Sequence, residues 1–164
     1  MLPVMHDVCE SVRARAVLFE ESRRRWPLDP VAPLPAPLPD ALFRPLAVAE
    51  RSRVFTHTSE PVGDWCVEID REVVATGGLL THYNPPYADL YMEVAPTWRQ
   101  RGIGSFLVSR LLDVARKQEH LPAARCNIAN AASRACLTRA GLMPCGHVLE
   151  GRIAHGFAGG GGGA

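Results

Sequence analysis

Residues 94–105 read VAPTWRQRGIGS, and the interpretation of the whole chain starts from this stretch. An alternating strand pattern stops at Pro96, two arginines follow in a short turn, and Gly102 and Gly104 open a long amphipathic segment. A helix that begins here directs its first free amide groups, and the positive end of its dipole, toward one point. Glycine also lets a ligand approach the backbone closely. The stretch therefore predicts either a cradle for phosphate groups or a purely structural helix start.

The residues before this stretch alternate as strands do. Three strands are expected, at 65–69, 73–81 and 90–94. A tight turn at Asp70–Arg71 and a loop at Asn84–Pro86 connect them, which predicts an antiparallel meander. The weaker pattern from 41 to 61 predicts a short helix and a strand around Val54–Thr58.

The residues after the stretch predict helices and strands in turn. A helix is expected at about 102–119, a strand at 125–129, a helix at 131–140 and a final strand at 145–153. Asn130 is placed to cap the second helix, and Gly141 follows the end of that helix. These elements together predict an α/β domain.

The two ends of the chain differ in composition from this domain. A helix is expected over residues 7–26, because apolar residues from Cys9 to Phe19 recur at helical spacing. Six prolines lie between Pro27 and Pro39 and predict an extended arm. The predicted divisions are a helix and proline-rich arm at 1–40, the α/β domain at 41–155 and a disordered glycine-rich tail at 156–164.

The overall composition excludes several classes of protein. Of the 164 residues, 47% are hydrophobic and 21% are charged, which excludes a disordered chain and a coiled coil. No apolar run approaches the roughly 18 residues of a membrane span, and Asp7 and Arg13 fall where a signal peptide is apolar, so we expect a cytoplasmic protein. A net charge of +1 gives no reason to expect a nucleic acid or membrane partner. The five cysteines form no CxxC pair, and no metal site is expected.

Two signatures in the sequence resemble those of a known family. Residues 99–104, RQRGIG, match the [RQ]xxGx[GA] motif of GCN5-related N-acetyltransferases, the GNAT superfamily. Residues 130–133 and 139–142 resemble the family's Asn-x-x-[AS] helix and its Lys/Arg-x-Gly-Phe-like end. The resemblance covers roughly residues 65–152. It implies the GNAT fold, a central and mostly antiparallel mixed sheet with splayed strands and flanking helices.

The resemblance implies acyl-CoA, most often acetyl-CoA, as the cofactor. The amides around Gly102 are expected to hold the pyrophosphate, with Arg99 and Arg101 either adding charge or lying solvated. The strand that ends at Val94 is expected to separate from its neighbour, bind the pantetheine arm and present the Val94 amide to the thioester carbonyl. Asn130 is expected either to lie near the thiol or only to cap its helix. The implied binding residues are Val94, Arg99, Gln100, Arg101, Gly102, Ile103, Gly104, Ser105, Asn130 and Ser133.

The resemblance also implies direct attack by an amine on the thioester in a ternary complex. A protonated amine has no lone pair, so a base is needed. Glu93 is the first candidate, unless it faces solvent or pairs with an arginine. His82 and Tyr83 lie in a loop that is expected to cover the acceptor site or to be plain surface. The tyrosine that many relatives use as an acid is replaced by Leu137.

The sequence therefore predicts an N-acyltransferase that moves an acyl group, most often acetyl, from acyl-CoA to an amine of a small molecule or peptide. Because Leu137 replaces the tyrosine, a non-catalytic acyl-CoA-binding or sensing module is the alternative. A nucleotide-binding protein with the same helix start is a third hypothesis. An edge strand near the C-terminus is expected to pair between subunits of a homodimer.

Overall fold

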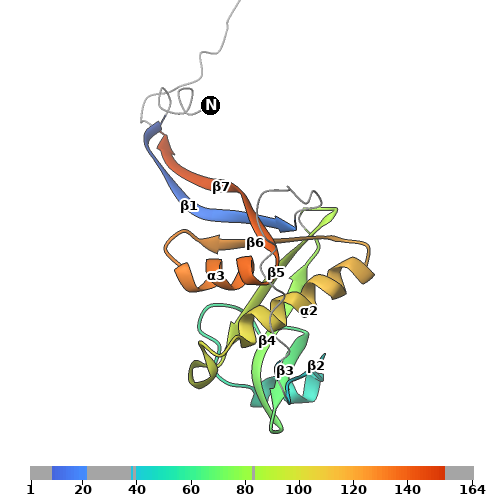
Figure 1. Ribbon diagram of the computed structural model, residues 1–164. Helices are drawn as coiled ribbons and strands as arrows, with labels where there is room; N and C mark the ends of the chain where they lie inside the picture. The colour runs from blue at the N-terminus through green and yellow to red at the C-terminus, as the bar shows by residue number, and fades with distance from the viewer. Residues whose placement is uncertain (1–8, 22–37, 39, 83, 154–164) are drawn as a thin grey trace, which may run out of the picture.

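The computed structural model describes residues 9–21, 38, 40–82 and 84–153. A mixed sheet of seven strands forms the centre of the described chain, in the order β2-β3-β4-β5-β6-β1-β7 (Figure 1). The strands are β1 (Cys9–Glu21), β2 (Leu42–Pro45), β3 (Trp65–Ile69), β4 (Glu72–Leu80), β5 (Tyr87–Val94), β6 (Leu121–Asn127) and β7 (Leu142–Ile153). The helices are the 3₁₀ helices η1 (Val48–Arg53) and η2 (Pro96–Trp98) and the α-helices α2 (Ile103–Lys117) and α3 (Ala131–Arg139).

The predicted meander is confirmed. β3, β4 and β5 pair antiparallel in chain order, and Asp70 and Arg71 form the tight turn with positive φ angles of 51° and 66°. The helices and strands predicted after Gly102 are also present, with their ends shifted by a few residues. The strand predicted at Val54–Thr58 is wrong, because these residues form irregular structure and β2 lies earlier in the chain.

The N-terminal segment is a strand, so the helix predicted over residues 7–26 is wrong for its described part. β1 lies between β6 and β7 and pairs antiparallel with both. Val17 and Phe19 are 6% and 2% exposed, whereas the alternate residue Glu20 is exposed, which is the period of a strand. The arm residues 22–37 and the tail residues 156–164 lie outside the described residues.

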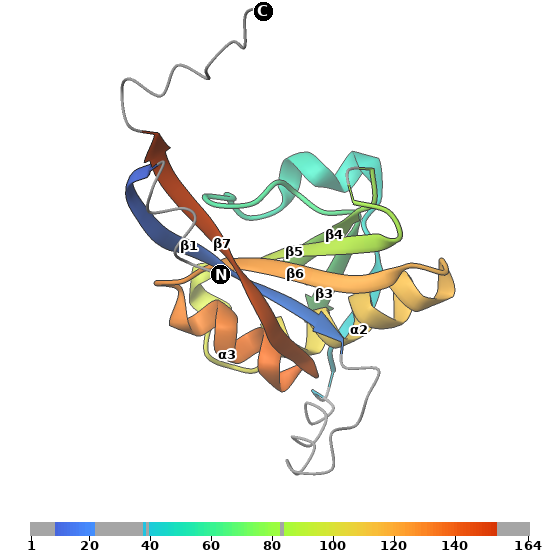
Figure 2. The same cartoon turned by 90° about the horizontal axis from the view of Figure 1, so that it is seen from above.

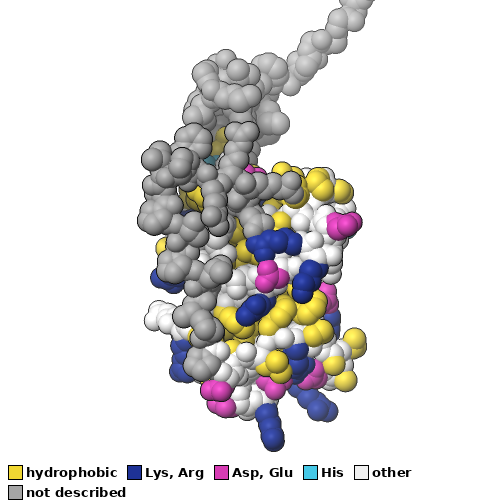
Figure 3. All heavy atoms as spheres, turned by 45° about the vertical axis from the view of Figure 1, so that its right-hand side comes forward, with side chains coloured by type: hydrophobic (Ala, Val, Ile, Leu, Met, Phe, Trp, Pro, Cys, Tyr) yellow, Lys and Arg dark blue, Asp and Glu magenta, His cyan; other side chains and the backbone are white. Residues whose placement is uncertain are grey.

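The helices α2 and α3 cover one face of the sheet, and the segment that contains η1 lies on the other (Figure 2). The predicted apolar face of α2 is buried on the sheet, at Ile103, Phe106, Leu107, Leu111, Val114 and Ala115. On the face viewed in Figure 3, basic and acidic side chains are interspersed with hydrophobic ones wherever the surface is described. No helix of the described residues has the length and apolar character needed to cross a membrane.

Glu93 of β5 holds the segment after η1 against the sheet. Its carboxylate accepts hydrogen bonds from the N–H groups of Thr58, Ser59 and Glu60 at 3.0–3.1 Å, and from the Thr58 hydroxyl at 2.9 Å. Successive N–H groups of this kind form a cradle for an anion. Burial raises the pKa of Glu93, but the hydrogen bonds from Glu60, Thr58 and Ser59 outweigh burial and lower the pKa to about 2.

His57 and Thr76 fasten the same segment beside Glu93. The His57 Nδ1 donates to the Glu60 carbonyl at 3.0 Å, because a carbonyl only accepts, and Nε2 lies within hydrogen-bond distance of the Thr76 hydroxyl at 3.2 Å. The Thr76 hydroxyl in turn accepts from the Gly63 N–H at 3.2 Å. A Cβ at Gly63 would lie 2.0 Å from the Gly77 carbonyl oxygen, so only glycine permits this approach to β4. The segment is thus packed directly on the sheet backbone.

We expect the substitution Glu93→Gln to lower the free energy of unfolding at pH 7 by about 3 kcal/mol, because a pKa of about 2 against an ordinary 4.5 corresponds to stabilisation of that order. A lowered pKa adds stability that is complete above about pH 5 and is lost as the pH falls toward 2. Urea unfolding at a series of pH values measures the difference. Glu72→Gln, at an exposed glutamate, is the matched control. An equal loss at pH 7 and pH 2 would contradict the electrostatic explanation.

Candidate functional site

The parallel strands β5 and β6 are joined along only part of their length. Their register runs from Tyr87 opposite Leu121 to Leu90 opposite Ala124. β5 continues to Val94 without pairing with β6, so a gap opens between the strands. The predicted separation of the central strands is therefore confirmed.

The backbone of Val94 faces this gap. The Ala95 N–H donates to the Val74 carbonyl of β4 at 2.9 Å. Because successive residues of a strand direct their N–H and C=O groups to opposite sides, those of Val94 point away from β4 and toward the gap. The Val94 carbonyl accepts a hydrogen bond from Arg99 Nε at 3.1 Å. The action of the Val94 N–H on a thioester carbonyl stays a prediction.

Two α-helices begin at the same edge of the sheet as the gap. Because β5 and β6 are parallel, their carboxyl ends lie together, and α2 and α3 follow these ends. Gly102 is the N-cap of α2, with φ 81° and ψ −5°, and no side chain caps the helix. Apart from its chain neighbours, a Cβ at Gly102 would meet no atom of the described residues within 4 Å, so the space beside Gly102 is open.

At the start of α3 the capping interpretation of Asn130 is confirmed. Its Oδ1 accepts a hydrogen bond from the Ser133 N–H at 3.0 Å. Burial raises the pKa of the Cys126 thiol, and the nearby Ser133 side chain opposes that shift. The proximity of Asn130 and Ser133 to a bound CoA thiol stays a prediction.

The side chains of the other predicted binding residues make contacts within the protein. Arg99 bonds to the Val94 carbonyl, and its Nη2 lies 3.9 Å from Glu93 Oε1. The Arg101 guanidinium lies over the Trp98 ring at 4.7 Å. The buried Ser105 hydroxyl donates to the Cys136 carbonyl at 3.3 Å, Ile103 lies in the core, and Gln100 is exposed with φ 64°. The predicted binding of CoA by these residues stays a prediction.

Of the predicted catalytic residues, Glu93 and His82 lie toward opposite ends of the β4–β5 pair. Glu93 is 6% exposed, and hydrogen bonds from four donor groups occupy both of its oxygens, which argues for anchoring and against proton acceptance. His82 is exposed just beyond the end of β4, and Tyr83 lies outside the described residues. Leu137 is 4% exposed in the hydrophobic core and contributes no polar group.

Glu60 is a candidate that the sequence analysis missed. Its N–H and C=O are held by Glu93 and His57, while the residue itself is exposed. Partial burial of its carboxyl group raises its pKa, the charges of Glu93 and Asp89 raise it further, and Arg125 lowers it. A carboxyl group with a raised pKa beside an open site is typical of proton transfer. No motif marks Glu60, because its position depends on hydrogen bonds to a strand far along the chain.

The chain matches the family model described as "Acetyltransferase (GNAT) family" over residues 18–142, which is well over half of its length. No curated protein matches the chain at a significant level.

Solved structures of GNAT proteins share the fold. One from Colwellia psychrerythraea has a TM-score of 0.68 at 14% identity, covering 91% of this chain and 59% of its own. One from Novosphingobium aromaticivorans has a TM-score of 0.61 at 16% identity, covering 86% and 64%. One from Sphaerobacter thermophilus has a TM-score of 0.54 at 14% identity, covering 90% and 54%.

The chain thus spans less than two thirds of the length of these three structures. At such low identity these structures show the likeness of fold alone, and the match to the family model shows the family. That match begins in β1, includes the gap and both helix starts, and ends at the first residue of β7. The chain belongs to the GNAT acetyltransferase family.

Proposed function

We propose that the protein transfers an acyl group, most often acetyl, from acyl-CoA to an amine of a small molecule or peptide. One observation carries the proposal: the gap between β5 and β6 opens at the edge where α2 and α3 begin. An elongated ligand with phosphates at one end and a reactive thioester at the other matches an anion cradle next to an opening in a sheet.

The start of α2 fits the pyrophosphate of CoA. The amides of residues 103–105 have no capping side chain, and the helix dipole places about half a positive charge there. The open space before Gly102 leaves room for the phosphates. The Val94 carbonyl, turned toward the gap, accepts from Arg99 and has a second lone pair that can accept from an amide N–H of the pantetheine arm.

Acyl-CoA supplies a thioester whose carbonyl carbon accepts the nucleophile. We assign the Val94 N–H to the carbonyl oxygen, where it stabilises the negative charge that develops during attack. The neutral amine forms a bond to the carbonyl carbon, the bond from carbon to sulfur breaks, and CoA leaves as a thiolate. An acceptor that arrives as an ammonium first gives one proton to a base and becomes the neutral amine. After the attack the nitrogen loses a second proton, which passes through water to the thiolate, so that the products are the amide and the free thiol.

We assign the acceptance of the amine proton to Glu60. Its carboxyl is exposed near Asp89, and its backbone is held beside the strand that borders the gap. Glu93 is left to anchor the segment, because its lowered pKa makes it a weak base. His82 stays a second candidate.

The substitution Gly102→Asp is expected to weaken binding of acetyl-CoA about tenfold more than Gly102→Asn does. The two side chains have nearly the same shape, and both tolerate the left-handed conformation at φ 81°. Only aspartate brings a negative charge to the proposed phosphate site, and tenfold corresponds to about 1.4 kcal/mol. Isothermal calorimetry with acetyl-CoA measures the affinities, with ATP as the control ligand.

Equal affinities for the Gly102 variants would contradict the phosphate site, and tight binding of ATP would favour a nucleotide-binding protein instead. Binding of acetyl-CoA without transfer to any amine in a broad panel would favour the non-catalytic sensing module.

The substitution Glu60→Gln is expected to lower kcat about 100-fold, the usual scale for loss of a general base, and to leave the affinity for acetyl-CoA unchanged. Steady-state assays of thiol release, together with calorimetry, separate the two effects. Glu72→Gln, at an exposed position on the first residue of β4, is the control for loss of one negative charge. A change in kcat below twofold would reassign the proton to His82 or to water.

A further inference from the structure

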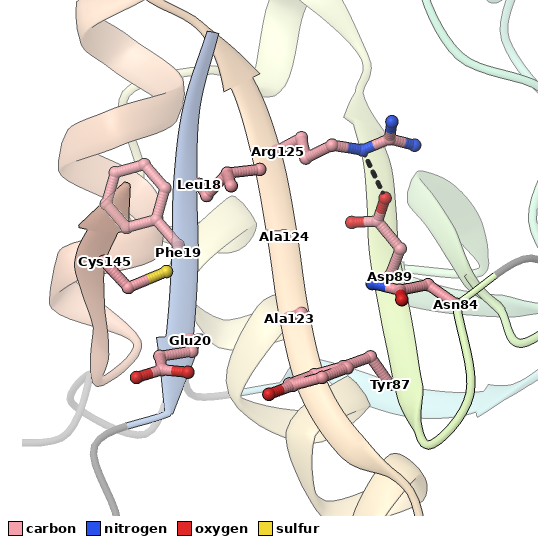
Figure 4. A pocket seen from close by; sticks show the side chains of 10 residues that line it. All are labelled: Leu18, Phe19, Glu20, Asn84, Tyr87, Asp89, Ala123, Ala124, Arg125 and Cys145. Carbon is pink, nitrogen blue, oxygen red and sulfur yellow. Dashed lines mark hydrogen bonds and ion pairs between the residues drawn. The ribbon is translucent and has the colours of Figure 1, made fainter. Parts of the chain in front are cut away.

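A pocket of about 390 Å³ lies on the sheet face that points away from α2 and α3 (Figure 4). The neighbours Leu90 and Ala124 face the core with α2, so the alternate residues Asp89 and Ala123 face the opposite side. The lining residues that matter here are Leu18, Glu20, Tyr87, Asp89, Ala123 and Arg125.

Three of these residues form one row across three strands. Ala123 of β6 pairs with Asp89 of β5 on one side and with Glu20 of β1 on the other. Neighbouring strands lie about 4.8 Å apart, so the two carboxylate residues are separated by about 10 Å across a floor of alanine. Figure 4 shows the Tyr87 side chain extending past Ala123, with its hydroxyl toward Glu20.

The Asp89 end of this row adjoins the gap. The pairing of β5 with β6 stops at Leu90 and Ala124, one residue beyond the row. Arg125, the next residue of β6, forms an ion pair with Asp89 at 2.6 Å. A molecule in the pocket therefore reaches the gap from the face opposite the helices.

The two ends of the pocket differ in charge. At the gap, Arg125 offsets the charge of Asp89. At the far end, Glu20 is exposed, and its carboxylate has no hydrogen bond or ion pair with any residue that the structure describes. Leu18, Ala123 and the Tyr87 ring provide apolar surface between the ends. The pocket is suited to a ligand with a cation at the Glu20 end, an apolar middle and a neutral group at the gap.

We propose that this pocket holds the acceptor and that the acceptor is a small aliphatic diamine or polyamine; the proposal rests on the acyl transfer proposed above. One nitrogen, protonated, pairs with Glu20, and the alkyl chain covers Ala123. The other nitrogen gives up its proton at the gap and attacks the thioester, with the same bonds made and broken as above. A monoamine has only one nitrogen. When that nitrogen pairs with Glu20, none is left to attack the thioester.

The test compares 1,5-diaminopentane, pentylamine and 5-aminopentanoate as acceptors in thiol-release assays at saturating acetyl-CoA. We expect kcat/KM for the diamine to exceed that for pentylamine at least tenfold. We expect 5-aminopentanoate, whose carboxylate meets Glu20, to be the poorest acceptor. Glu20→Gln is expected to bring the diamine within threefold of pentylamine, whereas Glu72→Gln, at a residue outside the pocket, leaves the ratio between the two acceptors unchanged. Calorimetry of 1,5-diaminopentane with CoA present should show the same loss of affinity in Glu20→Gln.

Ala123→Leu provides a steric check, because the larger side chain fills the pocket floor. This substitution should weaken diamine binding, while acetyl-CoA should still bind. Equal rates for the three acceptors, or a diamine preference that survives Glu20→Gln, would overturn the proposal while transfer itself still supported the proposed function. Failure of acetyl-CoA to bind would instead overturn the proposed function and this acceptor site with it.

Discussion

The end of backbone pairing between β5 and β6 after Leu90 and Ala124 is the constraint on which the site depends. A strand that loses one neighbour must keep the other, because buried backbone groups need hydrogen-bond partners. β5 stays paired with β4 as far as Val94, and β6 stays paired with β1 as far as Asn127. The N-terminal strand β1 therefore holds one side of the gap in place, as an integral part of the central sheet.

The gap has a different environment on each face of the sheet. On the helix side, the start of α2 offers amides to an anion. On the opposite side, the buried charge of Glu93 draws three successive amides from the segment after η1. The same contacts bring Glu60 to the border of the site. One anchoring carboxylate thus positions a second, exposed carboxylate, whose pKa is raised by partial burial and then by repulsion from Glu93.

The sequence predicted those features of the fold that depend on residues close together in the chain. The alternation from residues 65 to 94, the apolar face of α2 and the Asn130 cap all follow from near neighbours in the chain. β1 was mistaken for a helix because its apolar residues also suit a helical period, and only pairing with β6 and β7, more than 100 residues away, decides between the two. Glu60 was missed for the same reason, because its partner Glu93 lies far along the chain, on β5.

The loss of the usual tyrosine at Leu137 is compatible with catalysis because the two proton transfers differ in difficulty. A thiol has an ordinary pKa of about 8.5, so a thiolate leaves at neutral pH with little help from an acid. An alkylammonium group has a pKa near 10 and cannot attack until a base removes its proton. Leu137 packs in the core and supplies no acid, whereas the Glu60 side chain is exposed in the segment that Glu93 holds. In the proposed mechanism the chain therefore lacks an acid for the less demanding transfer and has in Glu60 a base for the other.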